Sequence, residues 1–68
     1  MKYWIVGSLE NKSILENMGI TLPKYSKKYG QWENVTLTSE QLTELDNHWG
    51  TFFWGKAGQL LEDVQKSK

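Results

Sequence analysis

The chain has 68 residues and a formal net charge of zero, with eight lysines, eight acidic residues, no arginine and no cysteine. A domain this small without cysteine has no disulfide, thiolate nucleophile or cysteine-bound zinc, so its stability must come from packing of large side chains or from self-association. The neutral balance argues against a protein that mimics DNA, because such a protein needs a densely acidic surface. The absence of arginine weakens the case for specific recognition of nucleic acid. The N-terminal apolar run is too short for a signal peptide core or a membrane span, so we expect a cytoplasmic protein that does not bind membranes.

The N-terminal segment "KYWIV" predicts a strand over residues 2–6, because it is rich in β-branched and aromatic residues and Gly7 ends it. A strand that is apolar on both faces belongs in the middle of a sheet or in a sheet covered on both sides. A short helix follows in "SILENMG", where Ser13 and Glu16 have the spacing of a capping box and Gly19 suits the C-terminal end. This helix could begin as early as Leu9.

Residues 20–37 have the pattern of an extended pair joined by a polar turn, with strands over residues 20–22 and 32–37. Pro23 marks a strand end or an edge strand, and Gly30 suits a positive φ angle in the turn. Simple alternation divides the second strand between two faces, with Val35 and Leu37 on one face and Trp32, Asn34 and Thr36 on the other.

A second helix is predicted over residues 39–49, where Thr38 and Gln41 form a capping box and Leu37 and Leu42 have the spacing of a hydrophobic staple. Gly50 is placed to end this helix. Its apolar stripe consists of Leu42, Leu45 and Trp49.

The segment "TFFW" predicts a short strand over residues 51–54. A continuous helix is the alternative, but Gly50, Gly55 and Gly58 would each cost up to about 1 kcal/mol inside it. The C-terminal segment predicts an amphipathic helix whose residues 65–68 are frayed. Its apolar side consists of Ala57, Leu60, Leu61 and Val64.

Together these elements predict one α+β domain over residues 1–68. We expect a small, mainly antiparallel sheet of three to four short strands, with two or three short helices packed on it. A shared core is expected to contain Ile5, Val35, Leu37, Leu42 and Leu45.

Catalytic motifs are absent from the sequence: it contains no nucleophile elbow, phosphate loop, metal-binding spacing or Rossmann glycine pattern. His48 could act as a lone general base, but a histidine in the last turn of a helix more often complements the helix dipole or caps carbonyl groups. We therefore expect neither an enzyme nor a cofactor or metal site.

The aromatic content favours a protein-binding module, since four tryptophans, three tyrosines and two phenylalanines exceed what a small core easily encloses. A stoichiometric inhibitor or adaptor, of the kind common among phages and mobile elements, is the leading hypothesis. The predicted partner-binding residues are Tyr25, Tyr29, Trp32, Phe52 and Trp54.

The alternative hypothesis is weak binding of single-stranded nucleic acid by the turn over residues 23–32. There Lys24, Lys27 and Lys28 alternate with aromatic residues, which is typical of surfaces that neutralise phosphates and stack bases. A third expectation concerns assembly: the "TFFW" strand could form an unprotected sheet edge that makes a homodimer or a partner contact through residues 51–54.

Overall fold

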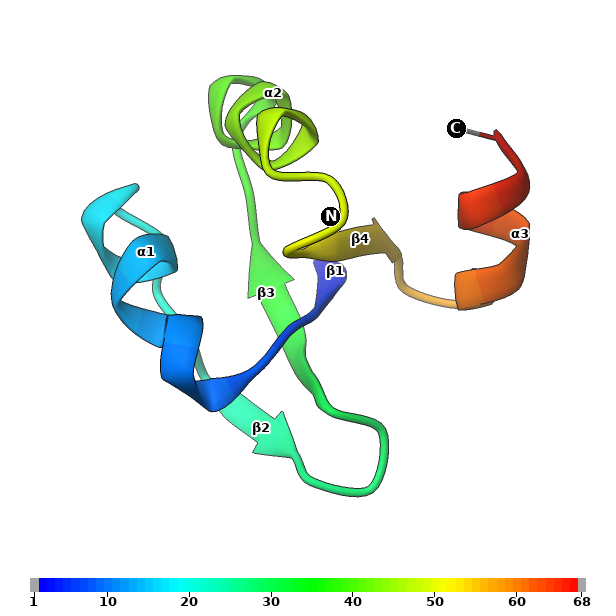
Figure 1. Ribbon diagram of the computed structural model, residues 1–68, viewed down its shortest axis with the longest axis horizontal. Coiled ribbons are helices and arrows are strands. Elements are labelled where there is room, and N and C mark those ends of the chain that lie inside the picture. Colours follow the sequence, from blue (N-terminus) through cyan, green and yellow to red (C-terminus); the bar gives the residue numbers. More distant parts are fainter. Residues whose placement is uncertain (1, 68) are drawn as a thin grey trace.

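The computed structural model describes residues 2–67 and confirms the α+β class, with an antiparallel four-stranded sheet in the order β2-β3-β1-β4 (Figure 1). The strands are β1 (Lys2–Val6), β2 (Lys24–Ser26), β3 (Gln31–Thr36) and β4 (Phe53–Lys56). The helices are α1 (Lys12–Asn17), α2 (Ser39–Asn47) and α3 (Leu61–Ser67), and a 3-10 turn, η1 (Leu9–Asn11), leads into α1. β1 lies inside the sheet, as its apolar sequence predicts.

The main core lies on the face of the sheet that α1 and α2 cover, which we call the inner face. Leu15 from α1 and Leu45 from α2 join Ile5 and Val35 from the sheet, and all four side chains are fully buried. Leu37 is also buried, and Leu42 packs against the same cluster, so the predicted core is confirmed. α3 lies apart from the other two helices, beyond β4 (Figure 1).

The first helix begins earlier than the predicted capping box. The Ser8 hydroxyl accepts a bond from the Glu10 N–H and starts the 3-10 turn that continues into α1. Ser13 therefore lies inside the helix, and its capping role is wrong. Gly19 ends the helix as predicted, with φ +80°, and its N–H and that of Ile20 donate to carbonyls of the last turn in a Schellman arrangement.

The predicted strand over residues 20–22 is also wrong: the chain joins the sheet only after Pro23, as the short edge strand β2. Ile20 is buried in the core without pairing in the sheet, which explains why its apolar character resembled a strand. Gly30 has the expected positive φ, +63°, in the turn between β2 and β3.

A β-bulge in β3 overturns the simple alternation predicted for this strand. Tyr3 pairs with Val35 and Ile5 pairs with Trp32, so two residues of β3 stand opposite Trp4 alone. The extra residue turns Trp32 onto the same inner face as Val35, and Trp32 is only 1% exposed. Asn34, within the bulge, has φ +58°, a left-handed conformation that asparagine tolerates better than most residues.

The capping box of α2 is confirmed in both directions. The Gln41 N–H donates to the Thr38 hydroxyl at 3.2 Å, and the Thr38 N–H donates to Gln41 Oε1 at 2.9 Å. The helix ends at Asn47, two residues before the predicted end, so Trp49 lies in the following turn.

We expect Thr38→Ala to lower the free energy of unfolding by about 1 kcal/mol, because it removes the acceptor for an N–H at the start of α2. Thr43→Ala is the matched control, since the Thr43 hydroxyl only bonds back to the Ser39 carbonyl within the helix. Urea unfolding monitored by tryptophan fluorescence measures both. Equal midpoints for the two variants would contradict the capping role.

The last strand and helix are shifted along the chain from their predicted positions. β4 covers residues 53–56, and Phe52 precedes it as a fully buried core residue. Ala57 and Leu60 lie before α3 and are exposed, whereas Val64 is buried within the helix. Residues 65–67 are helical, and Lys68 lies outside the described residues, so the predicted fraying stays a prediction.

Candidate partner-binding groove

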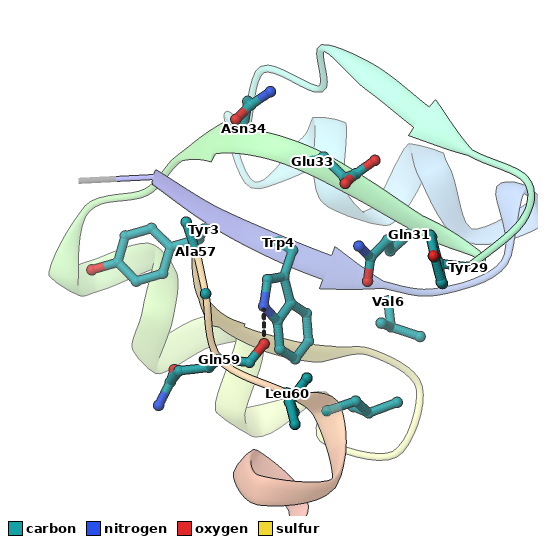
Figure 2. Close-up of a pocket in the computed structure, with 12 residues that line it drawn as sticks. Tyr3, Trp4, Val6, Tyr29, Gln31, Glu33, Asn34, Ala57, Gln59 and Leu60 are labelled. Carbon is teal, nitrogen blue, oxygen red and sulfur yellow. Dashed lines mark hydrogen bonds between the residues drawn. The ribbon is translucent and has the colours of Figure 1, made fainter.

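A groove with a volume of about 490 Å³ lies on the face of the sheet opposite α1 and α2, which we call the outer face (Figure 2). Its floor is formed by outer-face side chains of β1 and β3, including Trp4, Val6 and Gln31. Residues 57–61 form one wall, and Tyr29 from the turn before β3 stands at the opposite side. We call this feature the outer groove. It brings together residues that are far apart in the sequence.

Trp4 forms the centre of the floor and is held from two sides. Its indole N–H donates to the Gln59 carbonyl at 3.1 Å, which ties the wall to the sheet (Figure 2). The indole ring lies against the backbone of Gly55, where an added Cβ would be 2.4 Å from Trp4 Cζ2. Gly55 pairs with Trp4 across β1 and β4, so the absence of a side chain there makes room for the ring.

The bulge in β3 supplies the polar end of the groove. Glu33 and Asn34 both line it, and both stand opposite Trp4 in the sheet (Figure 2). Bulges commonly re-aim side chains in this way. Sequence reasoning missed both residues, although asparagine in a predicted strand is a recognisable signal for a left-handed residue.

Exposed apolar side chains stand on both sides of the groove. Tyr29 is 62% exposed and Leu60 is 60% exposed, and both line the cavity. Leu9, 50% exposed, is the third large apolar side chain exposed among the described residues, and it lies outside the groove. Two of the three therefore gather at one site.

The five predicted partner-binding residues do not form one surface. Trp32 and Phe52 are buried in the core, so their side chains offer no surface to a partner. Tyr25 is half-buried, with its ring edge-to-face on Trp32 and its hydroxyl donating to the Gly7 carbonyl at 2.9 Å. Tyr29 is the residue of this set that lines the outer groove.

Trp54, the fifth predicted residue, lies with the inner-face residues. It pairs with Ile5 across the sheet and packs edge-to-face on Tyr3. Its indole N–H donates to Asp46 Oδ1 at 3.0 Å, which links β4 to the last turn of α2. Trp54 therefore connects elements of the fold, and it belongs to a different surface from Tyr29.

The three lysines predicted to contact nucleic acid are all exposed. Lys24 lies on β2, and Lys27 and Lys28 lie in the turn that follows it. The Lys28 ammonium is 5.3 Å from the centre of the Tyr29 ring, within the range of a cation–π contact. Because Tyr25 and Trp32 pack into the fold, Tyr29 is the exposed ring among the aromatic residues of this segment.

His48 occupies the C-cap of α2, where its backbone N–H bonds to carbonyls of the last turn and its ring packs edge-to-face on Phe52. No group of three or more His, Asp or Glu side chains within residues 2–67 is placed to hold a metal ion. In the same part of the chain, no helix is both long and apolar enough to cross a membrane.

The predicted free edge at residues 51–54 is partly occupied by local hydrogen bonds. The N–H groups of Thr51 and Phe52 both donate to the His48 carbonyl. Further along, the Lys56 N–H donates to Gln59 Oε1 at 2.7 Å, and the Gln59 N–H donates back to the Lys56 carbonyl. These bonds weaken the basis for a homodimer through this edge, which stays an untested prediction.

A second hollow, of about 350 Å³, lies between the end of α1 and the start of α2. Two of its polar side chains already serve the helix ends: Thr38 and Gln41 form the capping box, and Gln41 Nε2 donates to the Met18 carbonyl. The outer groove is therefore the stronger candidate site.

The fold and the outer groove define a small α+β domain with an open, largely apolar groove on one face of its sheet. Comparison with protein family models, curated proteins and solved structures gives no match.

Proposed function

We propose that this protein is a non-enzymatic protein-binding module, acting as a stoichiometric inhibitor or adaptor, and that its outer groove receives part of the partner. The observation that carries the proposal is the position of Tyr29 and Leu60, two exposed apolar side chains on opposite sides of one groove. Covering such side chains on binding is favourable by roughly 25 cal/mol per Å² of apolar surface. Apolar side chains with a polar surround are typical of protein interfaces.

The residues that line the groove support binding more than catalysis. Among those that the structure describes, Glu33 is the single carboxylate, and none is histidine, lysine or serine. Nucleophilic catalysis typically pairs a nucleophile with an activating base, and the described lining residues include no serine, threonine, cysteine or lysine. The groove instead offers aromatic, aliphatic and amide side chains, which suit recognition of another chain.

Nucleic acid remains the second candidate because Lys24, Lys27 and Lys28 are exposed and the Lys28 ammonium lies over the Tyr29 ring. Three lysines contribute only a few phosphate contacts, and a single exposed ring stacks few bases. The observations therefore favour a protein partner over nucleic acid.

The test is affinity capture from cell extract on immobilised wild-type protein and on a Tyr29→Ser/Leu60→Ser double variant. We expect a protein that binds wild type to be retained at least tenfold less by the double variant, because both sides of the groove lose apolar surface. Both changes are at exposed positions, so each should alter the free energy of unfolding by less than about 0.5 kcal/mol.

Leu9→Ser is the matched control, since it also removes an exposed apolar side chain but lies outside the groove. A partner retained by wild type and by Leu9→Ser but lost from the double variant supports the proposal. Equal retention by all three would contradict it. The captured material could instead be lost after nuclease treatment and be absent from a Lys27→Ala/Lys28→Ala variant. That result would establish nucleic-acid binding.

A further inference from the structure

Glu33 places an unpaired carboxylate at one end of the outer groove. The side chain is half-buried, and within the described residues it accepts no hydrogen bond and forms no ion pair. Lys24 stands directly opposite it across β2 and β3, yet the two side chains form no ion pair. The side chain is thus partly exposed, and it lines the groove that a partner would cover.

A partner that covers the groove removes water from Glu33. An ionised carboxylate that loses its hydration without gaining a partner is strongly destabilising, so the covering surface must supply a cation or hydrogen-bond donors. A carboxylate from the partner would add like-charge repulsion at the same point. A partner that fits the groove therefore carries positive charge where it meets Glu33 and apolar surface where it covers Trp4 and Leu60.

We propose, resting on the function proposed above, that the partner presents a large apolar side chain with a lysine or arginine close by in the same segment. The apolar side chain packs over Trp4 between Tyr29 and Leu60, and the cation meets Glu33. Arginine fits best, because its planar guanidinium can donate two parallel hydrogen bonds to one carboxylate.

The experiment selects random 12-residue peptides displayed on phage against the immobilised wild-type protein. Affinities of the enriched peptides are then measured by fluorescence anisotropy for wild type and for Glu33→Gln. We expect the enriched peptides to carry lysine or arginine within a few residues of an aromatic residue or leucine. Glu33→Gln should weaken their binding about five- to tenfold, and about 0.5 M salt should remove most of that difference.

Glu16→Gln is the matched control, because it removes the same charge from an exposed position on α1, behind the opposite face of the sheet. Enriched peptides without basic residues, or a Glu33→Gln variant that binds as tightly as Glu16→Gln, would overturn the inference while leaving the groove as a binding site. If the peptides bind the Tyr29→Ser/Leu60→Ser variant as well as wild type, the proposed function itself fails.

Discussion

Phe52→Ala is expected to unfold most of the protein at 25 °C. The Phe52 side chain is fully buried, and it packs so closely on the chain that a Cβ added at Gly7 would lie 2.6 Å from its ring. Truncating a buried phenylalanine typically costs about 3–5 kcal/mol, and a domain of this size without disulfides has a total stability of about 3–5 kcal/mol. The loss therefore equals most or all of the stability.

Phe53→Ala provides the matched comparison, since it makes the same chemical change one residue along the chain. Phe53 is half-buried and packs edge-to-face on Trp49, so its truncation should cost about half as much or less. Circular dichroism during thermal unfolding distinguishes the two variants. A Phe52→Ala protein that melts at the same temperature as Phe53→Ala would show that the Phe52 side chain does not belong to the core.

Gly55→Ala is expected to have the second large effect, lowering the free energy of unfolding by about 2–3 kcal/mol. A Cβ at this position would lie 2.4 Å from Trp4 Cζ2 and 2.8 Å from Trp4 Cε2, so the indole ring has to move. Overpacking of this kind forces side chains away from their preferred conformations. Displacing the ring also disturbs the floor of the outer groove and the bond from Trp4 to the Gln59 carbonyl.

A double-mutant cycle with Trp4→Phe isolates the steric cause. The three atoms nearest to a Cβ at residue 55 all belong to the six-membered ring of the Trp4 indole. A phenyl ring is smaller than the indole, so Trp4→Phe should leave more room for a methyl group at residue 55. We expect Gly55→Ala to cost at least about 1 kcal/mol less in the Trp4→Phe background. An equal cost in both backgrounds would mean that Trp4 does not lie against Gly55.

Elements with local chemical signals could be predicted from the sequence. Three such signals are the apolar run of β1, the capping box at Thr38 and the glycine at residue 19. Each depends only on residues close by in the sequence, so it can be recognised without knowledge of the tertiary structure. For the first helix, the alternative start at Leu9 is confirmed and the capping box at Ser13 is wrong, because Ser8 turns the chain into the 3-10 segment.

The faces of the strands could not be predicted, because one bulge reverses the alternation. Without the extra residue in β3, Trp32 would point to the outer face; with it, Trp32 is buried and Glu33 and Asn34 line the groove. A bulge depends on pairing with β1, which local periodicity does not encode. For this reason Trp32, predicted as a contact residue, belongs to the core.

The outer groove was also beyond prediction, since its parts come from three separate segments of the chain. Trp4, Tyr29, Glu33 and Leu60 meet only because β1 lies between β3 and β4 and because residues 57–61 fold back over the sheet. Tyr29 was predicted as a contact residue from its type and its place in a turn. The other three residues became candidates only through tertiary structure.

The most direct test of the central claim is a two-dimensional ¹H–¹⁵N NMR titration of the wild-type protein with the tightest peptide from the display selection. Binding in the outer groove should give the largest shifts at the indole N–H of Trp4 and at the backbone of Val6, Gln31 and Leu60, with the indole N–H of buried Trp32 little changed. Shifts centred on α1 and α2, or confined to Lys27 and Lys28, would contradict binding in the outer groove.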